Sequence, residues 1–498
     1  MSKQTNISLY LGVDIGSSGV KAMLLSLDKK IIAEATVSID LHSRRPGWAE
    51  AESNDWWKAL RSLVPELLMK ANEAASSIKA VAISGMVPAV LFLDEKKSSL
   101  RSAILQNDAR AVTEIDELRE SLSNFNVLEK TGSVLSQQSV APTVLWISRH
   151  EPEVWGSTRY VVGSYDWMAI ALGAEVHVEA NWAMESGLYG FDRLPLQEVQ
   201  DATHLTWTPL SVVKIPGTVV GVVSTAAAAA TGLARGTKIV VGGADHVLSA
   251  YGAGLINNGD CLVKLGGACD ILAVSDEKLL DPRLYLDIHP APDKWLPNGC
   301  MATSGSLLRW EEKIFENVTL ASLDQLARES KPGSLLALPY FLGEKTPLHD
   351  ASLRGVIAGL HLGTTRGDLH RSFLEAIAYG VRHHFEVFAE CGLKLNSPRI
   401  TNGGSKSTLW KEIMADVLDL ELIPIIGHPG ASFAAAIIAA IGVGDFHDWS
   451  IVTGWLMQGE SITPNSKNRV IYNERYLEYR ELHLRTEDIS HSLVRGSQ

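Results

Sequence analysis

Apolar and polar positions along the chain fall into blocks that predict alternating strands and helices. Short runs rich in Val, Ile, Leu and Ala predict buried strands at residues 9–13, 80–84 and 239–241, and each run leads into a turn that contains glycine. Longer segments with helical spacing of apolar positions cover residues 54–75 and 368–390. Strands that alternate with helices are typical of an α/β protein, so the pattern predicts this fold class.

A single carboxylate follows the strand predicted at residues 239–241. The stretch 239–254 reads IVVGGADHVLSAYGAG: a strand, two glycines, Asp245, and then small residues that continue as a helix. Ligands of open α/β sheets bind outside the carboxyl ends of strands, so Asp245 is placed to act on a substrate. Asp is also a preferred helix N-cap residue. The pattern alone therefore leaves a catalytic base and a helix cap open.

The first strand opens a hairpin that suits a phosphate group. The motif D-I-G-S-S-G, which begins at Asp14, joins residues 9–13 to a second strand at residues 20–25. Glycine lets backbone N–H groups approach an anion, and Asp14 suits Mg²⁺, which prefers oxygen ligands. A plain hairpin with an Asx turn is the alternative. Strand, glycine turn and strand recur at residues 262–274, which is weak evidence for two similar lobes.

Two further polar clusters suit the parts of a sugar and a nucleotide. Asn107, Asp108 and Arg110 bring a carboxamide, a carboxylate and a guanidinium together, as a polyhydroxylated ligand requires. The alternative is a turn with an exposed ion pair, worth at most about 1 kcal/mol. Residues 403–405 read Gly-Gly-Ser at the start of a predicted helix, which leaves an open face for an adenosine group. The alternative there is a tight turn with a Ser cap.

Composition limits the partners and the compartment. With 498 residues, two or three domains are expected, and a net charge of −12 argues against binding to nucleic acid. The four cysteines lack CxxC spacing, so we expect reduced thiols and no zinc site. The N-terminus lacks the apolar region of a signal peptide, and no apolar run reaches the roughly 18 residues of a membrane span. A cytoplasmic protein without a membrane partner is predicted.

Eight short motifs follow one another along nearly the whole chain in the order that one family shows. The chain resembles the FGGY carbohydrate kinases, and within them the xylulokinase-like branch. The motifs are Asp14-Ile-Gly-Ser-Ser, Gly47-Trp-Ala-Glu50, Asn54-Asp-Trp-Trp57, Gln106-Asn-Asp-Ala-Arg110, Gly242-Gly-Ala-Asp245, Tyr340-Phe-Leu-Gly-Glu-Lys-Thr-Pro347, Arg354-Gly355 and Gly403-Gly-Ser-Lys-Ser407.

The resemblance implies two ribonuclease-H-like lobes, as in actin and hexokinase, with sugar and ATP in a central cleft. We expect an N-terminal, sugar-binding lobe over residues 1–235 and a C-terminal, ATP-binding lobe over residues 236–485. A polar tail is expected over residues 486–498, with disorder after Ser490. Packing of the two lobes is expected to bring Asp14 and Asp245 together across the cleft. ATP and Mg²⁺ are the implied cofactors, and the sequence leaves a homodimer open.

The resemblance also implies residue roles. Asp245 is implied to be the base that takes the proton from a sugar hydroxyl, and Asp14 to be the Mg²⁺-linked aspartate, with Asp245 as a second metal-side carboxylate. Sugar contacts are implied for Met86, Val87, Asn107, Asp108, Arg110 and His246. Nucleotide contacts are implied for Gly16, Ser17, Ser18, Lys21, Gly266, Gly267, Gly305, Gly403, Gly404 and Ser405.

Three departures from the family pattern bear on the substrate. Xylulokinases usually show S-G-Q-M-H-G at the end of the strand predicted at residues 80–84, whereas residues 84–89 here read SGMVPA, so Met86 and Pro88 replace polar residues. A buried sugar hydroxyl without a partner is costly, so we expect a different ligand or a different contact. Gly267 stands where the family has Thr. His246 stands where relatives carry Asn or Gln, and either contacts the sugar or caps the helix.

The function that these features predict is ATP-dependent phosphorylation of a small sugar or polyol. A ketose or alditol of about four to six carbons fits a small-molecule site of this kind. The alternative is a non-catalytic, actin-like protein that binds a nucleotide for sensing or assembly. The departures from the family pattern at Met86, Pro88 and Gly267 motivate this alternative.

Overall fold

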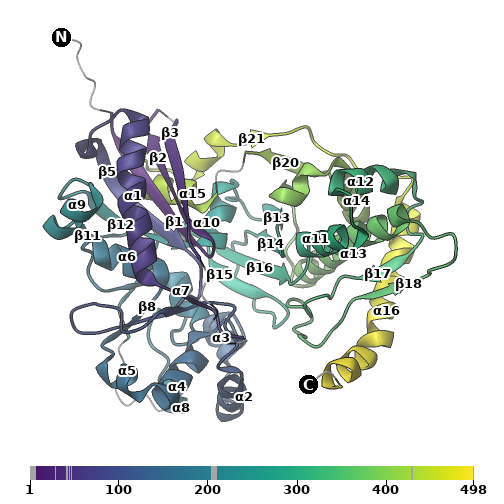
Figure 1. Cartoon of the computed structure of the whole chain (residues 1–498), viewed down its shortest axis with the longest axis horizontal. Helices are drawn as coiled ribbons and strands as arrows, with labels where there is room; N and C mark the ends of the chain where they lie inside the picture. The colour runs from purple at the N-terminus through teal and green to yellow at the C-terminus, as the bar shows by residue number, and fades with distance from the viewer. Residues whose placement is uncertain are drawn as a thin grey trace, which may run out of the picture. The chain divides into compact units, whose positions relative to one another are not determined.

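The chain folds into two compact units. The computed structural model describes residues 7–28, 30–40, 43, 45, 47–203, 210–427 and 430–496. Unit 1 comprises Met1–Ile256, Leu286–Trp295 and Pro429–Trp455, and unit 2 comprises Asn257–Tyr285, Leu296–His428 and Leu456–Gln498. Each unit is therefore assembled from segments that lie far apart in the sequence (Figure 1).

Unit 1 is built on a mixed sheet with the strand order β11-β12-β5-β1-β2-β3. The first three strands form an antiparallel meander. β5 pairs in parallel with β1, β12 pairs in parallel with β5, and β11 pairs antiparallel with β12 at the edge of the sheet. The strands are β1 (Leu9–Gly16), β2 (Gly19–Ser26), β3 (Ile31–Ser38), β5 (Ile78–Gly85), β11 (Val219–Val222) and β12 (Lys238–Ala244). The strands and the hairpin predicted in this half of the chain are confirmed.

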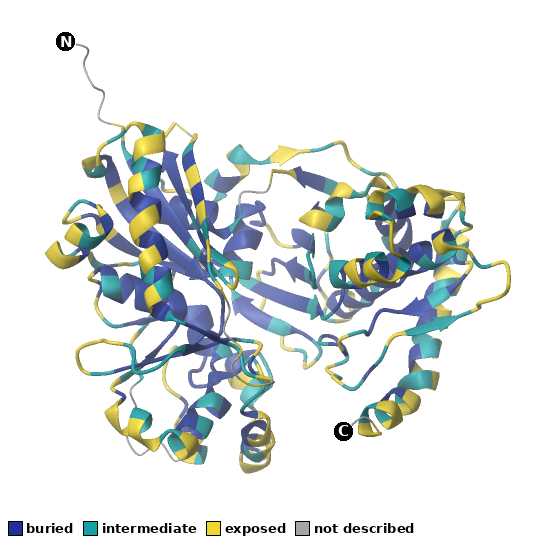
Figure 2. Cartoon of the chain, viewed as in Figure 1, coloured by how far each residue is buried: buried dark blue, intermediate teal, exposed yellow. Residues whose placement is uncertain are grey.

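Helices cover this sheet and bury nearly all of its central strands (Figure 2). Helix α1 (Ser53–Ala71) packs on β2 and β3, and α15 (Ala431–Gly442) packs on β1, β5 and β12. Side chains alternate between the two faces of a strand, so Asp14 shares the α15 face with Tyr10 and Gly12. The alanine-rich surface of α15 can come this close because Gly12 has no Cβ: a Cβ there would overlap the main-chain oxygen of Ser432.

The predicted lobe boundary at residues 235 and 236 differs from this division. Strand β12 pairs with β5 from Lys238 to Ala244, so the strand and the helix that follows it belong to unit 1. Helix α15 and the segment Leu286–Trp295 also belong to unit 1, although they lie in the second half of the sequence. Hydrophobic periodicity identifies these elements but does not report which sheet each one joins.

Short elements complete unit 1. They are β4 (Glu50–Ala51), η1 (Ala75–Ser77), β6 (Leu91–Leu93), β7 (Ala103–Ile104), α2 (Val112–Ser121), α3 (Val127–Thr131), α4 (Val140–His150), α5 (Pro152–Ser157), β8 (Tyr160–Val162), α6 (Ser164–Leu172), β9 (Val178–Glu179), α7 (Ala180–Glu185), α8 (Gln197–Ala202), β10 (Val213–Lys214), α9 (Thr225–Thr231), α10 (Asp245–Gly252) and η3 (Trp449–Trp455).

Unit 2 contains a second sheet, in which β16-β14-β13-β19-β20-β21 are neighbours in that order. Its strands are β13 (Cys261–Leu265), β14 (Cys269–Ala273), β16 (Trp295–Met301), β19 (Arg399–Thr401), β20 (Ile423–Ile426) and β21 (Met457–Gln458), and β15 (Tyr285–Ile288) precedes β16. β13 and β14 form the antiparallel hairpin that the sequence repeat predicts, and β19 pairs in parallel with β13. The sheet therefore repeats the hairpin and parallel strand of unit 1.

The remaining elements of unit 2 are mainly helices around one apolar core. They are α11 (Gly305–Phe315), α12 (Leu320–Glu329), β17 (Leu336–Leu338), β18 (Val356–Ala358), α13 (Arg366–Glu390), η2 (Gly403–Lys406), α14 (Thr408–Leu418) and α16 (Arg469–Arg495). None of the helices in the described part of the chain combines the length and the apolar character that a membrane span requires.

The predicted polar tail is instead the last part of helix α16. This helix runs without a break to Arg495, so the expectation of disorder after Ser490 is wrong as far as the structure describes the chain. Tyr472, Tyr476 and Tyr479 anchor the helix in the core of unit 2. Near its end, the Nε2 atom of His491 lies 2.6 Å from Oδ2 of Asp350. The tail is polar because it is an amphipathic helix.

We expect Gly12→Ala to destabilise unit 1. The added methyl group would overlap the Ser432 oxygen and lie 2.5 Å from the main-chain nitrogen of Ala436, both of them backbone atoms of α15. Overpacking of this kind costs about 1–3 kcal/mol. Urea unfolding of the variant measures this cost. Gly156→Ala in α5 is the matched control, because its Cβ meets nothing within 4 Å. Equal stabilities of the two variants would contradict the close approach of α15.

Candidate active site

Asp14 and Asp245 lie at the same edge of the unit 1 sheet. Asp14 is opposite Ser84 of β5, Ser84 is opposite Gly243 of β12, and Asp245 follows β12 directly. Since neighbouring strands are ~4.8 Å apart, β1 and β12 are separated by about 10 Å across β5. The structure thus brings the two acids together, but the expected cause is wrong: one shared sheet places them, not the packing of two lobes.

A bulge at Gly242 directs the end of β12. The register with β5 shifts by one residue between Val241 and Gly243. A Cβ on Gly242 would overlap the main-chain oxygen of Ile83, so only glycine fits here. A bulge changes the face toward which the following side chains point. The paired glycines of the motif therefore decide where Asp245 emerges from the strand.

Asp245 is the first residue of α10 and is not its N-cap. Ala244 holds the N-cap position and makes no side-chain cap. One oxygen of Asp245, Oδ1, accepts a hydrogen bond from the main-chain N–H of His246 at 2.6 Å. The Asp245 side chain remains 36% exposed. The helix-cap interpretation therefore does not fit, and the carboxylate is accessible to a substrate.

Both ring nitrogens of His246 face carboxylates. Nε2 donates to Oδ2 of Asp287 at 2.8 Å, and Nδ1 lies 3.6 Å from Oδ1 of Asp245. Burial opposes the charged imidazolium, but the neighbouring Asp287, Asp245 and Glu185 outweigh it and raise the pKa of His246 well above its usual value. A sugar contact through a ring nitrogen, as predicted for His246, would have to replace one of these contacts.

Two acids that the sequence analysis did not single out complete this cluster. Glu185 ends α7, and Asp287 lies near the end of β15; donor atoms of Glu185, His246 and Asp287 all lie within 4.8 Å of one another. Burial, and then the charge of Asp287, raise the pKa of Glu185 well above its usual value. No motif marks either residue, because they are separated by about a hundred positions and meet only through the fold.

The predicted sugar-side residues after β5 are buried. Met86 is 2% exposed and Val87 is 4% exposed. The main-chain N–H of Met86 donates to the oxygen of Ile15, and its carbonyl oxygen accepts from Oγ of Ser164. The structure gives both side chains the environment of core residues, and their role in sugar binding stays a prediction.

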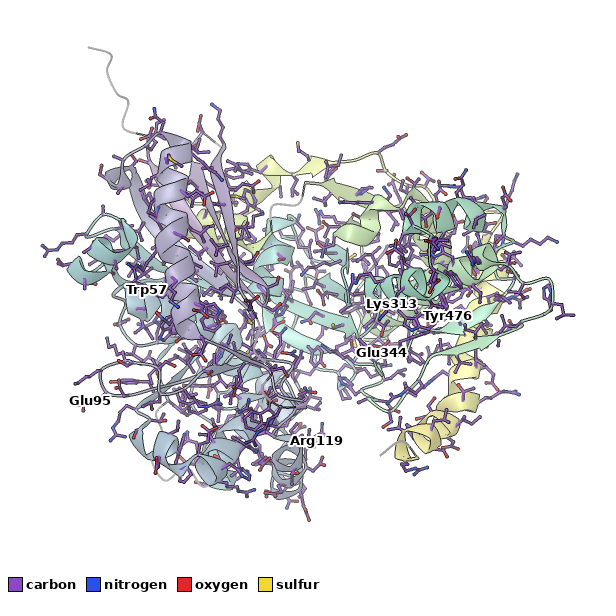
Figure 3. All side chains as sticks on the ribbon, viewed as in Figure 1. Trp57, Glu95, Arg119, Lys313, Glu344 and Tyr476 are labelled. Carbon is purple, nitrogen blue, oxygen red and sulfur yellow. The ribbon has the colours of Figure 1, made fainter. Side chains whose placement is uncertain are left out.

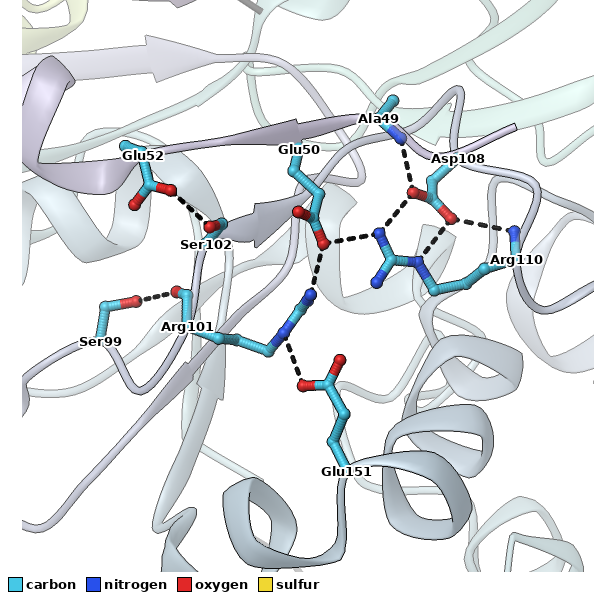
Figure 4. Close-up of polar contacts among 9 residues, drawn as sticks. All are labelled: Ala49, Glu50, Glu52, Ser99, Arg101, Ser102, Asp108, Arg110 and Glu151. Atoms are coloured by element: carbon cyan, nitrogen blue, oxygen red, sulfur yellow. Dashed lines mark hydrogen bonds and ion pairs between the residues drawn. The ribbon is translucent and has the colours of Figure 1, made fainter. Parts of the chain in front are cut away.

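Asp108 and Arg110 belong to a buried ion-pair network (Figure 4). The Arg110 guanidinium makes two bonds to Asp108, at 2.7 and 2.8 Å, and one to Glu50 at 2.8 Å, and it stacks 3.7 Å from the Trp48 ring centroid. Arg101 also bonds to the Glu50 carboxylate. Burial opposes the charge on Glu50, but the two arginines outweigh it and lower its pKa.

This network changes the interpretation of the 107–110 cluster. The side chains of Arg110 and Asp108 are 1% and 3% exposed, so the exposed ion pair considered as the alternative is wrong. The Asp108 carboxylate also accepts from the main-chain N–H of Ala49. These contacts occupy both side chains within the protein, whereas Asn107 is exposed. The sugar-binding role of the three residues stays a prediction.

The predicted phosphate turn of unit 1 is an open hairpin next to Asp14. Gly16 is opposite Gly19, and the two residues between them, Ser17 and Ser18, are exposed. Lys21 is opposite Asp14 across the hairpin and lies 3.5 Å from Glu34. The turn and the Asp14 carboxylate therefore share one corner of the sheet, and the phosphate-binding roles of the turn and Lys21 stay predictions.

The predicted nucleotide residues of unit 2 also converge. The Gly305 N–H donates to the Gly266 oxygen at 2.9 Å, and a Cβ on Gly305 would lie 2.6 Å from that oxygen. A Cβ on Gly266 would lie 3.4 Å from the amide nitrogen of Asn402, which directly precedes Gly403. The turn after β13, the start of α11 and the end of β19 thus meet at one edge of the sheet.

The residues after β19 form a short 3₁₀ turn. A Cβ on Gly404 would lie 2.5 Å from the Trp410 ring, whereas nothing lies within 4 Å of a Cβ on Gly403. Ser405 donates through Oγ to the Asn402 oxygen, and the residue that caps α14 is Ser407, through a bond from Trp410 N–H. Gly404 is therefore required by packing, and Gly403 has the open face that an adenosine group needs.

Glu344, labelled in Figure 3, makes main-chain contacts close to this corner of unit 2. Its motif was recognised in the sequence without a role. Its carboxylate accepts from the main-chain N–H groups of Ala302 at 2.7 Å and Lys345 at 2.9 Å. Ala302 directly follows β16 and lies three residues before Gly305, the first residue of α11. Burial outweighs these donors and raises the pKa of Glu344 to about 8.

Comparisons with known proteins agree with this architecture. Residues 9–252 match the N-terminal domain model of the FGGY family of carbohydrate kinases, and residues 264–443 match the C-terminal domain model. A xylulose kinase from Staphylococcus epidermidis is 28% identical over 98% of each chain, and one from Bacillus subtilis is 26% identical over 97% of this chain and 98% of its own. The first family match ends close to the boundary of unit 1.

Solved structures confirm the predicted fold class. The crystal structure of xylulose kinase from Rhodospirillum rubrum has a TM-score of 0.91 and 37% sequence identity, and the match covers 97% of this chain and all of that chain. The crystal structure of a xyloylose kinase from Brucella ovis has a TM-score of 0.90 and 27% sequence identity, and the match covers 97% of this chain and all of that chain. The two-domain α/β fold and the family resemblance are both confirmed.

We expect Asp108→Ala to reduce stability far more than it affects sugar binding. The variant leaves the buried Arg110 guanidinium short of a partner, and breaking a buried ion pair costs about 3–5 kcal/mol. Asp55→Ala is the control, because Asp55 pairs with Lys58 on the surface of α1, where the cost is about 0–1 kcal/mol. Urea unfolding separates the two variants. An unchanged stability with a raised KM for sugar would show instead that Asp108 is a sugar ligand.

We expect Glu344 to make stability depend on pH. Its raised pKa means that the folded chain holds the proton more tightly than the unfolded chain. The resulting stabilisation is complete below the unfolded pKa near 4.5 and is lost as the pH rises through about 8. Relative to Glu344→Gln, the wild-type chain should therefore lose up to about 1.4 kcal/mol per pH unit across this window. Urea unfolding at several pH values tests this, and a constant difference would refute it.

Proposed function

Because the chain belongs to the FGGY family of carbohydrate kinases, we propose that it transfers the γ-phosphate of ATP to a hydroxyl group of a small, uncharged sugar or polyol. A ketose or alditol of about four to six carbons fits such a site. Support for a ketose comes from the relatives named xylulose kinase. The observation that carries the proposal is the position of Asp14 and Asp245 at one edge of the unit 1 sheet.

In this proposal Asp245 is the general base. Its half-exposed carboxylate takes the proton of the attacking hydroxyl group while the hydroxyl oxygen forms a bond to the γ-phosphorus. The bond between that phosphorus and the bridging oxygen breaks, and ADP leaves. Phosphoryl transfer depends mainly on positioning and charge stabilisation, so a fixed carboxylate at the end of a strand is the main requirement.

Asp14 supplies the carboxylate of the metal side. Mg²⁺ prefers oxygen ligands and keeps several waters, and the carboxylates of Asp14 and Asp245 are donors of this kind. When bound, the metal ion would neutralise negative charge on the phosphates. Lys21, opposite Asp14, adds a fixed positive charge at the same corner, and the exposed turn at Ser17 and Ser18 offers hydroxyl and backbone donors to phosphate oxygens.

The nucleotide side is assigned to the glycine-rich corner of unit 2. Gly266 and Gly267 form the turn beside α11, and Gly305 begins that helix. Gly403 has an open face for the adenosine group, while Gly404 and Ser405 shape the turn behind it. The loss of the family's Thr at Gly267 removes one hydroxyl group from this corner.

The charges near Asp245 favour an uncharged substrate. Glu185, Asp245 and Asp287 surround the single imidazole of His246. The partly exposed carboxylate of Asp245 would repel the carboxylate of a sugar acid, whereas a sugar hydroxyl group can donate to it. The non-catalytic sensor considered as an alternative is not favoured, because full-length relatives are named as kinases. A homodimer and the absence of nucleic-acid partners stay predictions.

We expect Asp245→Asn to lower ADP release about 10²- to 10⁴-fold, the usual contribution of a general base. The measurement is a coupled ADP assay with ketoses, alditols and, as a charged comparison, gluconate. Asp116→Asn on α2 is the control, because Asp116 is exposed and lies 3.8 Å from Arg119 in a surface ion pair. Full turnover by Asp245→Asn on the best substrate would reject the assignment. A clear preference for gluconate would reject the uncharged substrate class.

A further inference from the structure

A segment from the second half of the sequence contributes an acid to unit 1. The segment Leu286–Trp295 lies in the sequence between two stretches of unit 2, but it packs as part of unit 1. It carries Asp287, whose side chain is 3% exposed. None of the eight family motifs contains this segment, so its acid has no assigned role.

Two sets of hydrogen bonds fix the segment in place. The buried side chain of Asn181 binds both main-chain groups of Ile288: Oδ1 accepts from the N–H at 2.7 Å, and Nδ2 donates to the carbonyl oxygen at 3.0 Å. His289 donates through Nε2 to the oxygen of Leu255, just after α10, and accepts from the Ala291 N–H through Nδ1. Asp287 therefore has a rigid backbone on its carboxyl side.

From this fixed position the Asp287 side chain contacts His246, the second residue of α10. Its Oδ2 accepts from Nε2 of His246 at 2.8 Å, and Nδ1 of the same ring lies 3.6 Å from Oδ1 of Asp245. The exposed fraction of the side chain rises along this series, from 3% for Asp287 through 21% for His246 to 36% for Asp245. These two contacts connect the buried carboxylate of Asp287, through the His246 ring, to the partly exposed carboxylate of Asp245.

The geometry limits what Asp287 can do. It is too buried to meet a substrate while its hydrogen bond to His246 is intact, and the direct 2.8 Å bond leaves no space for a cation between the two groups. What it can do is hold the imidazole ring in one orientation. A ring held in this way keeps Nδ1 at 3.6 Å from Oδ1 of Asp245, the oxygen that also accepts from the His246 main-chain N–H.

We propose that Asp287 is a positioning residue for Asp245 and acts through the ring of His246. The inference rests on the proposed function, in which Asp245 is the base. Without Asp287 the His246 ring loses its 2.8 Å bond at Nε2, so the position of Nδ1 beside the Asp245 carboxylate is less closely fixed. Small displacements of a reacting group slow catalysis strongly without preventing substrate binding.

The effect should therefore appear in kcat and not in KM. We expect Asp287→Asn to lower kcat about 10- to 100-fold, because a misplacement of about 1 Å costs rate on this scale. The KM values for sugar and ATP should stay near those of the wild type. Asp293→Asn is the matched control: Asp293 lies in the same segment, is exposed, and has a left-handed backbone that Asn also tolerates.

A double-mutant cycle with His246→Gln tests whether the effect passes through the ring. If it does, Asp287→Asn should cause no further loss of kcat in the His246→Gln background. Melting temperatures of all variants, measured alone and with ADP, identify any loss of folding. If His246→Gln does not fold, Asp287→Asn and its more conservative partner Asp287→Glu still decide the question, since partial recovery of kcat by Glu is expected.

Three results would overturn the proposal. An unchanged kcat in Asp287→Asn would show that Asp287 only stabilises the fold. A raised KM for sugar at constant kcat would make it a binding residue. An equal loss of kcat from Asp287→Asn in the wild-type and His246→Gln backgrounds would show that His246 does not transmit the effect. Asp245→Asn separates this outcome from failure of the proposed function: if that variant is fully active, the base assignment fails, and if it is inactive while Asp287→Asn is normal, only the present inference fails.

Discussion

The parallel pairing of β1, β5 and β12 decides where the candidate chemistry of unit 1 lies. Parallel strands end at a common edge of the sheet, and this register puts Asp14, Ser84 and Gly243 in one row. The bulge at Gly242 then turns the end of β12, so that Asp245 emerges at the start of α10. Removal of the parallel pairing would separate the two acids, whatever residues surrounded them.

Close backbone contacts make this register possible, and glycine is the residue that permits them. Gly12 admits α15 onto β1, and Gly242 admits the bulge beside Ile83. Unit 2 repeats the principle with Gly305 against the oxygen of Gly266 and with Gly404 against Trp410. In both units the glycine-containing motifs are first a packing requirement. The candidate ligand-binding corner in each unit is the surface that remains once this packing is satisfied.

The sequence could predict those parts of the fold and the site that depend on local pattern. The strands at residues 9–13 and 239–241, the hairpin at Asp14 and the helix over residues 368–390 carry strong periodic or turn signals. The family motifs placed Asp14 and Asp245 at the ends of the correct strands. The register explains why both residues are informative: Asp14 lies near the end of β1, and Asp245 directly follows β12.

The remaining features depend on contacts between distant segments, which no local pattern reports. Because β12 pairs with β5, unit 1 extends past the predicted boundary at residue 235. Residues 286–295 also belong to unit 1, although they lie in the second half of the chain. The local sequence around Asp108 and Arg110 does not tell whether the two side chains are exposed or buried. They are buried because Arg110 contacts Glu50 and Trp48, which lie about sixty residues earlier in the chain. Asp287 gave no signal at all, since its partner His246 is about forty residues away.

We propose that Asp14 and Asp245, placed by one sheet, serve a single phosphoryl-transfer site. Rapid-quench measurement of γ-phosphate transfer in one turnover tests it directly, with Asp14→Asn, Asp245→Asn and the double variant compared at saturating sugar and ATP. The account predicts that each substitution removes most of the transfer rate and that the second adds little to the first, as expected of residues that act as a unit. A normal transfer rate in either single variant would contradict it.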